Sequence, residues 1–161
     1  MNANQLRRVL VSRRIVGDVC PADKLPSRVQ RKPSVYIVNT DNSGRPGQHW
    51  VLFYFPRRGP AEFFDSLAHT PESYRTRFRN VLIVNAPRYA YNNRQLQDVQ
   101  SDSCGAFCLY YAIRRWKGAS MKKILGSFHH QTLRTNDRLV RRYLQRHTRI
   151  AWLNTRSSWQ S

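Results

Sequence analysis

The sequence predicts a single α+β domain, residues 1–161, in which a mixed β-sheet packs on a central helix that begins at Cys104. Three observations predict this fold: a strand-like run of β-branched and aromatic residues at 34–40, an apolar helical segment at 104–116, and an order of helix, then strands, then helices. A chain of 161 residues is long enough for one hydrophobic core and too short for two.

The first expected element is a helix that Asn4 caps and that ends near Arg14. Leu6 and Val9 are spaced to share its apolar face. Residues 17–33 are rich in Pro, Asp, Lys and Ser, and this composition favours a loop.

Strands are expected on both sides of a turn. Residues 34–40 and 50–55 both combine β-branched and aromatic side chains, and the segment 41–47, which contains Gly and Pro, turns the chain between them. A second turn at 56–60 leads to a hairpin partner at 61–64.

The second half of the sequence is expected to be mainly helical. Residues 71–79 predict a short helix and residues 81–84 a further strand. The most apolar helix is expected at 104–116, and a last, amphipathic helix at 136–147. A basic tail, 148–161, is a candidate for a flexible segment.

Positive charge dominates the composition. Twenty-eight Lys and Arg face nine Asp and Glu, giving a net charge of +19, while 40% apolar residues argue against global disorder. Such a surplus favours a polyanionic partner over a basic surface that serves solubility alone. Its spread along the chain suits contact with phosphates rather than reading of bases. The candidates for DNA contact are Arg13, Arg14, Arg31, Lys32, Arg114, Arg115, Lys117, Lys122, Lys123, Arg141 and Arg142.

Several classes of protein do not fit the sequence. The N-terminal residues lack a secretory signal and no apolar stretch is long enough to cross a bilayer, so we expect synthesis in the cytosol and no membrane contact. Three cysteines, Cys20, Cys104 and Cys108, are too few for a disulfide framework, and none forms a Cys-x-x-Cys pair. We therefore expect neither a metal nor a cofactor.

Cys104 has the setting of a nucleophile. It follows a polar loop at the expected start of a helix, where backbone amides and the helix dipole favour a thiolate. His49, after the first turn, is the candidate base, and Asp65, at the near end of the hairpin partner, is expected to reach its ring. Gln97 and the backbone N–H of Cys104 are the candidate oxyanion donors. Taken singly, each residue is more often structural, so the joint pattern carries the interpretation.

This ordered set resembles the adenovirus endopeptidase (adenain) family. His49-Trp50 after a Gly-containing turn, then Phe64-Asp65, then Gln97, then a Cys-Gly pair at Cys104 follow the order of that family and of its relatives, the ubiquitin-like-protein proteases. The match runs from about residue 36 to 111. The stretch Asp-x-Cys-Gly-x-Phe-Cys-Leu-Tyr looks especially like versions in adenovirus-related DNA viruses and virus-like transposons.

The resemblance implies a cysteine endopeptidase of the adenain or ubiquitin-like-protein protease fold. It implies that Cys104 is the nucleophile, His49 the base, Asp65 the orienting acid and Gln97 the oxyanion donor. Trp50 and Gly105 are candidates for lining the site, with packing under the histidine favoured for Trp50. It further implies cleavage of viral capsid and core precursors after Gly, in short Gly-containing motifs, during virion maturation in the host nucleus and the virion. We expect the enzyme to be a monomer.

Two features depart from the family pattern. Asp65 stands where adenoviruses of mammals generally carry Glu, and Gln100 competes with Gln97 for the oxyanion role, although the spacing favours Gln97. The family enzyme is activated by DNA and by a short peptide that forms a disulfide with a cysteine upstream of the nucleophile. No cysteine lies between Ser66 and Ser103, so any activating peptide is expected to bind without a disulfide.

Two other functions remain open. A ubiquitin-like-protein protease that cuts Gly-Gly tails has the same catalytic residues, although the short length and the basicity favour the viral group. The other is a non-catalytic nucleic-acid-binding core protein with a degenerate protease fold. The presence of all four candidate catalytic residues argues against it, since drift would usually remove at least one.

Overall fold

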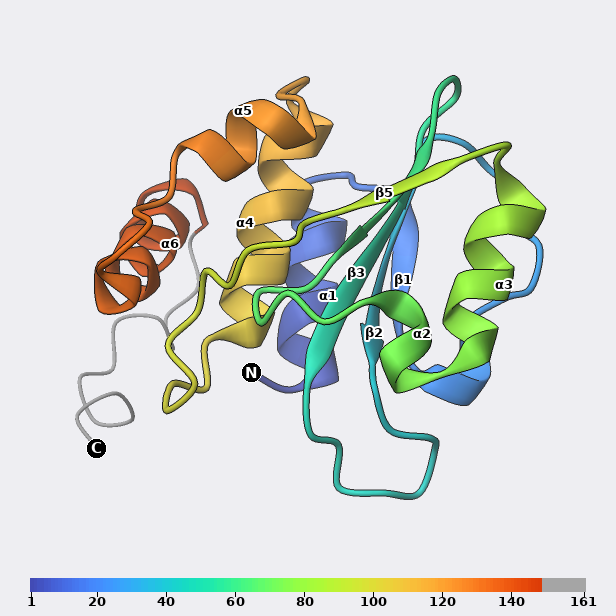
Figure 1. The fold of residues 1–161 in the computed structure, drawn as a ribbon, viewed down its shortest axis with the longest axis horizontal. Coiled ribbons are helices and arrows are strands. Elements are labelled where there is room, and N and C mark those ends of the chain that lie inside the picture. Colours follow the sequence, from blue (N-terminus) through green and yellow to red (C-terminus); the bar gives the residue numbers. More distant parts are fainter. Residues whose placement is uncertain (149–161) are drawn as a thin grey trace.

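A five-stranded mixed β-sheet separates two groups of helices (Figure 1). The computed structural model describes residues 1–148. Neighbouring strands in the sheet follow the chain order, β1 and β2 are parallel, as are β4 and β5, and the two central pairs are antiparallel. The strands are β1 (Gly17–Pro21), β2 (Ser34–Asn39), β3 (Trp50–Phe55), β4 (Ala61–Phe64) and β5 (Tyr89–Tyr91). The α+β fold and the mixed sheet predicted from the sequence are confirmed.

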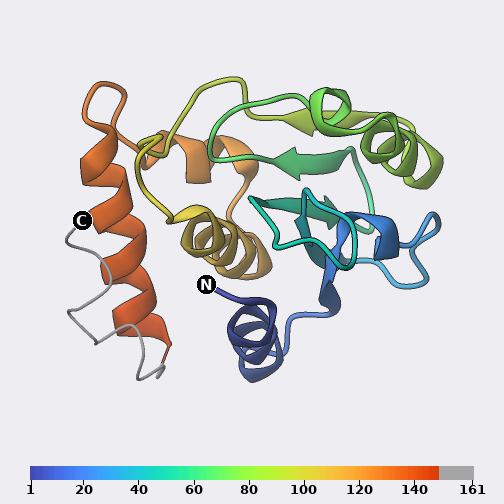
Figure 2. The ribbon, with the colours of Figure 1, turned by 90° about the horizontal axis from the view of Figure 1, so that it is seen from below.

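Each face of the sheet is covered by helices and has its own apolar cluster (Figures 1 and 2). One face packs on α1 (Ala3–Ser12) and α4 (Cys104–Trp116), with α5 (Met121–Gly126) and α6 (Leu133–His147) outside α4. The other face packs on α2 (Pro71–Tyr74) and α3 (Thr76–Asn85).

The central strand β3 is buried on both faces. Leu52 belongs to the cluster under α4, whereas Val51 and Phe53 belong to the cluster under α3. This alternation follows from the period of two in a strand, and it explains why β3 reads as a continuous apolar run. Because β3 is fixed from both sides, the residue that precedes it is held firmly at the end of the sheet.

Helix α4 packs on β3 and is the most buried helix of the fold. Its first ten residues, Cys104 to Ile113, are all buried. The helix ends where Gly118 adopts a φ of +101°, a conformation that favours glycine. The prediction of a central helix over 104–116 is therefore confirmed.

Three local predictions were wrong. The N-cap of α1 is Asn2, which forms a capping box with Gln5, rather than Asn4. The expected loop at 17–33 contains β1, followed by a short 3₁₀ helix, η1 (Ala22–Lys24). Residues 81–84 belong to α3, because Phe78, Val81 and Leu82 are buried on one helical face and this spacing overrides their strand propensity.

Two further elements, α5 and β5, were not predicted, and α6 begins at Leu133, earlier than expected. The predicted basic tail lies, from residue 149 onward, outside the described residues. Within residues 1–148, no helix combines the length and the apolarity that crossing a membrane requires.

Candidate active site

His49 directly precedes β3 at one end of the sheet. Its carbonyl accepts a hydrogen bond of 2.9 Å from the backbone N–H of Thr40, which extends the pairing of β2 with β3. In the preceding turn Gly47 has a φ of +83°, and a Cβ atom there would lie 2.7 Å from the side chain of Asn39. The glycine therefore lets the turn close tightly against β2 and fixes where the imidazole stands.

Asp65 directly follows β4, and its side chain is completely buried. Oδ1 accepts hydrogen bonds from Nε2 of His49 at 2.6 Å and from the backbone N–H of Leu67 at 2.9 Å. Oδ2 accepts from the hydroxyl of Tyr74 at 2.6 Å and from the backbone N–H of His69 at 3.2 Å. Four donors compensate for removing the carboxylate from water. The expected contact between Asp65 and His49 is present.

The backbone of Asp65 is held by a side chain from a distant loop. Asn92 accepts from the N–H of Asp65 at 3.0 Å and donates to its carbonyl at 2.6 Å. Asn92 is buried, and this two-point contact replaces the strand pairing that ends at Phe64. Sequence reasoning missed this residue, because nothing in the loop distinguishes it from an ordinary turn asparagine.

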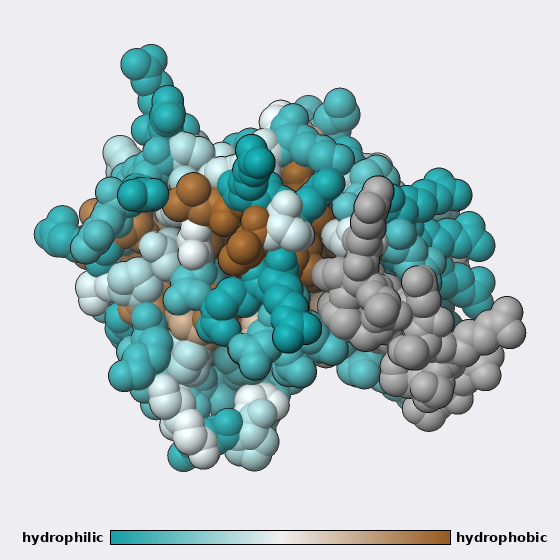
Figure 3. All heavy atoms as spheres, turned by 180° about the vertical axis from the view of Figure 1, so that it is seen from behind, coloured by the Kyte–Doolittle hydropathy of each residue, from teal (hydrophilic) through white to brown (hydrophobic). Residues whose placement is uncertain are grey.

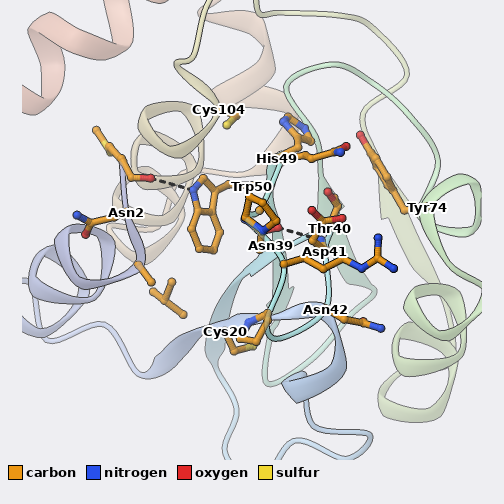
Figure 4. Close-up of a pocket in the computed structure, with 18 of the residues that line it drawn as sticks. Asn2, Cys20, Asn39, Thr40, Asp41, Asn42, His49, Trp50, Tyr74 and Cys104 are labelled. Atoms are coloured by element: carbon orange, nitrogen blue, oxygen red, sulfur yellow. Dashed lines mark hydrogen bonds between the residues drawn. The ribbon is translucent and has the colours of Figure 1, made fainter. Parts of the chain in front are cut away.

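Cys104 is the first residue of α4, and its thiol lies beside the ring of His49 (Figure 4). The two side chains are hydrogen bonded. Since Nε2 is engaged by Asp65, Nδ1 is the ring nitrogen that remains for the sulfur. The structure thus joins Cys104, His49 and Asp65, which come from three separate elements, in one hydrogen-bonded chain.

The electrostatics of this chain favour a thiolate and an imidazolium. Burial acts to raise the pKa of the Cys104 thiol, but the hydrogen bond and charge of His49, with the backbone groups of Trp50 and Gly105, lower it below its usual value. Burial acts to lower the pKa of His49, but its hydrogen bonds to Asp65 and Cys104 raise it to about 9. The pKa of Asp65 is lowered against the effect of burial, chiefly by His49.

Gln97 is 3% exposed and fixed in orientation. Its Oε1 accepts from the hydroxyl of Ser66 at 2.6 Å, and its Nε2 donates to the carbonyl of Ser101 at 2.9 Å. An amide nitrogen carries two protons, so one remains for an oxyanion. Gln97 lines the same cleft as Cys104, whereas the competing Gln100 is exposed and does not line it.

His49, Gln97 and Cys104 line a cleft of about 1200 Å³, and Figure 4 shows His49 and Cys104 in it. Its walls are the residues before and in the first half of α1, the end of β1, the segment 39–50, residues before and at the end of α2, and the loop that leads to α4. A cleft of this size has room for several residues of an extended peptide.

Of the two candidates for lining the site, Trp50 lines the cleft and Gly105 does not. Trp50 lines the cleft, packs on the α4 cluster and donates from Nε1 to the carbonyl of Met1 at 3.1 Å. Gly105 is buried behind Cys104 and is not among the residues lining the cleft. A Cβ atom there would meet Met1 at 3.1 Å and Leu6 at 3.3 Å.

The basic candidates fall into two groups. Arg115 is partly buried in an ion pair of 2.9 Å with Glu62, which also accepts from the hydroxyl of Tyr111. This guanidinium is occupied inside the fold, and we remove it from the candidates for phosphate contact. Hydrophilic side chains cover most of the face seen from behind (Figure 3). The exposed candidates are Arg14, Arg31, Lys32, Lys117, Lys122, Lys123 and Arg142, and the partly buried ones are Arg13, Arg114, Arg115 and Arg141.

No group of three His, Cys, Asp or Glu residues within 1–148 could hold a metal ion.

No protein-family model matches the chain, and no curated protein matches it. Among solved structures, one similar chain is described as the crystal structure of the Se-Met ASFV pS273R protease. The sequence identity is 22% and the TM-score 0.44, over 66% of this chain and 42% of that chain. A likeness of this extent assigns neither family nor activity.

Proposed function

We propose that the protein is a cysteine endopeptidase with Cys104 as its nucleophile. The observation that carries this proposal is the hydrogen-bonded chain from Asp65 through His49 to Cys104 at the wall of a peptide-sized cleft. A structural cysteine needs no buried imidazole–carboxylate pair beside it, and such a pair is what activates a thiol as a nucleophile.

The geometry supports an acyl-transfer mechanism. The thiolate of Cys104 attacks the peptide carbonyl carbon, and the oxygen becomes an oxyanion held by Nε2 of Gln97 and the backbone N–H of Cys104. The imidazolium of His49 gives its Nδ1 proton to the leaving amine as the C–N bond breaks, which leaves a thioester. His49 then takes a proton from water, whose oxygen attacks the thioester. The thiolate leaves, the peptide acid is released, and the pair is restored.

The proposed substrates are viral capsid and core precursors, cut after Gly in short Gly-containing motifs during virion maturation. The host nucleus and the virion are the proposed locations, and the enzyme acts as a monomer. These proposals rest on the resemblance of about residues 36 to 111 to the adenain family. An enzyme that processes ubiquitin-like proteins has the same site residues and differs in requiring a folded partner beside the Gly-Gly tail.

The test is cleavage of a fluorogenic Leu-x-Gly-Gly peptide by wild type and by Cys104→Ala. We expect turnover in wild type and none in the variant. A full-length ubiquitin-like precursor, tested beside the peptide, separates the two kinds of protease. Only a protease that processes ubiquitin-like proteins is expected to cut the precursor much faster than the peptide. Folded wild type that cuts neither substrate, with and without DNA, would overturn the proposal of an endopeptidase.

Stimulation by DNA is the second part of the proposal, and a basic groove on α6 supports it. Arg138, Arg142 and Arg146 follow each other at intervals of four residues beside Tyr110 and Tyr143, and they line a cavity of about 520 Å³. Their rise along the helix is about 6 Å per interval, so the row covers about 12 Å. One strand of B-DNA presents a phosphate about every 3.4 Å of helix axis, so this row suits three or four phosphates.

Further positive charge lies beside this groove. Nζ of Lys117 lies 5.8 Å from the centre of the Tyr143 ring, and the guanidinium of Arg114 lies 5.4 Å from that of Tyr110. The residues that follow α6, 149–161, carry two arginines and no acid, so their charge does not complement the groove. A polyanion does.

Replacing the three arginines of this groove with glutamine tests the proposed contact with DNA. In Arg138→Gln/Arg142→Gln/Arg146→Gln we expect weaker DNA binding and a salt dependence reduced by about three units in the slope of log K against log salt. The matched control is Arg57→Gln/Arg58→Gln/Arg88→Gln, which removes the same charge from exposed positions away from α6. Equal losses in both variants would indicate a diffuse effect of net charge and contradict the groove.

A further inference from the structure

Tyr74 is a residue that the sequence analysis did not single out, and it contacts both members of the His49–Asp65 pair. Its hydroxyl donates to Oδ2 of Asp65 at 2.6 Å, which is as short as the bond from His49 to Oδ1 of the same carboxylate. Its ring lies beside the imidazole, with centroids 6.0 Å apart and planes inclined by 30°. It also lines the cleft (Figure 4).

The hydroxyl of Tyr74 is itself oriented by a second histidine. Nδ1 of His69 lies 2.8 Å from the Tyr74 oxygen. The hydroxyl has one proton, which it gives to Asp65, so His69 must be the donor in this contact. His69 also anchors the carboxylate directly, through its backbone N–H. The hydrogen-bonded chain therefore continues from Asp65 through Tyr74 to His69, whose side chain is 56% exposed.

The start of α2 explains why Tyr74 can make this contact. Pro71 begins the helix and is buried, and the helix ends after a single turn at Tyr74. Tyr74 also lies 6.5 Å, between ring centroids, from Phe78 of α3, which is fully buried. The tyrosine is thus held by the core on one side and aimed at the carboxylate on the other.

We propose that Tyr74 is a positioning residue for the catalytic pair. Its hydroxyl fixes the second oxygen of Asp65, so that the first oxygen stays directed at Nε2 of His49. Its ring covers one side of the imidazole and limits the access of water. The assignment rests on the proposed use of His49 and Cys104 as a catalytic pair. Its effect on the thiolate is measurable without any peptide substrate.

The direction of the effect follows from the charges that face Asp65. The titratable groups around it are His49, His69 and Tyr74, with Cys104 and Cys108 on α4. Without the hydroxyl, Oδ2 of Asp65 is no longer fixed, so Oδ1 is held less firmly towards Nε2 and the imidazolium of His49 is less stable. A less stable imidazolium raises the pKa of the Cys104 thiol and lowers the pKa of His49. The pH window in which the thiolate–imidazolium pair exists becomes narrower from both sides.

The test is the rate of alkylation of Cys104 by iodoacetamide against pH in wild type and Tyr74→Phe. The variant keeps the ring and removes only the hydroxyl. We expect the acid limb of the profile of alkylation rate against pH to move to a higher pH by about one pH unit. We expect kcat/KM for the peptide to fall about tenfold through kcat, with KM unchanged, as for the loss of a hydrogen bond to a charged group. Alkylation of Cys104→Ala gives the background from Cys20 and Cys108, both of which are buried.

Tyr91→Phe is the matched control, since Tyr91 lies on β5 and is 40% exposed. A lowered melting temperature in Tyr74→Phe with an unchanged alkylation profile would mean that Tyr74 only supports the fold, and would overturn the proposal. An alkylation profile equal to that of wild type in Tyr74→Phe and Tyr91→Phe would also overturn the proposal. A shifted profile in a protein that cuts no peptide would support the positioning role while contradicting the endopeptidase.

Discussion

Cys104 and Cys108 lie one turn apart on α4, and both are buried, yet the pKa values of their thiols move in opposite directions. Burial raises the pKa of Cys108 well above the usual value, and the nearby Cys104 adds to the rise. Burial acts on Cys104 in the same sense, but His49 reverses it. Among residues 1–148, no cation lowers the pKa of Cys108, and its sulfur donates weakly to the carbonyl of Trp50 at 3.5 Å.

The comparison shows that α4 alone does not make a nucleophile. The dipole of the helix and its free amides act within the first turn, so they favour Cys104 over Cys108 but only modestly. The larger difference comes from the turn before β3 and the end of β4, which deliver the imidazole and the carboxylate to Cys104. The lowered pKa of the Cys104 thiol is therefore a property of the sheet end, and the helix supplies the position of the cysteine.

The largest effect is expected from exchanging the two cysteines for alanine in turn. Cys104→Ala should lower kcat/KM for the peptide by at least about 10⁴-fold, because the covalent route is lost. Cys108→Ala should keep activity within a few-fold and cost about 1 kcal/mol of stability through the cavity left in the core. Peptide kinetics and thermal unfolding check both. Equal loss of activity in the two variants, with both folded, would contradict the distinction.

The next largest effect is expected from changing Asp65, the carboxylate that supports the His49 imidazolium beside Cys104. Wild type should show a bell-shaped kcat/KM whose basic limb lies near pH 9, since His49 has a pKa of about 9. In Asp65→Asn the imidazolium loses its anionic partner, so the pKa of His49 falls and that of Cys104 rises. We expect kcat/KM to drop by about 10²- to 10⁴-fold, with both limbs moved inward.

An Asp65→Asn variant that keeps both limbs in place would show that the pair does not depend on this carboxylate. Asp98→Asn is a suitable control, because this carboxylate pairs with Arg134 at 3.2 Å outside the chain of catalytic candidates.

A smaller effect is expected at the oxyanion donor, and it separates thiolate formation from transition-state binding. Gln97→Ala should lower kcat by about 10²- to 10³-fold with little change in KM. The alkylation rate of Cys104 should stay at the wild-type level, because Gln97 makes no contact that sets the pKa of the thiol. Gln100→Ala, at an exposed position, should behave as wild type. A loss of alkylation in Gln97→Ala would assign the residue a structural role.

The parts of the fold that depend on strong local patterns were predictable from the sequence. The helix from Cys104 and the strands β2, β3 and β4 have unambiguous apolar runs and clear turns between them. The meeting of His49 and Asp65 followed from the hairpin alone, because the ends of adjacent antiparallel strands lie side by side.

The rest depends on contacts between distant segments, which one sequence does not reveal. The strand β1 contains Gly, Asp and Pro and forms because its backbone pairs in parallel with β2. Asn92 and Tyr74 reach Asp65 only once β5 and α2 are placed. Asn is common in turns, and Tyr74 is one of eight tyrosines in the sequence, so no local signal separates these two residues from others of their kind.

The smallest effect is expected at Gly105, between the two cysteines. Its missing Cβ points at α1, where Met1 and Leu6 would approach to 3.1 and 3.3 Å, and not into the cleft. In Gly105→Ala the flexible Met1 side chain has to give way, while alanine gains about 1 kcal/mol of helix propensity. The backbone N–H that helps to hold the Cys104 thiolate is retained. Stability should therefore change by less than about 1 kcal/mol and kcat/KM by less than about threefold. A loss of activity above tenfold in a folded Gly105→Ala would show that a substrate approaches the backbone here, from the side that α1 covers in this structure.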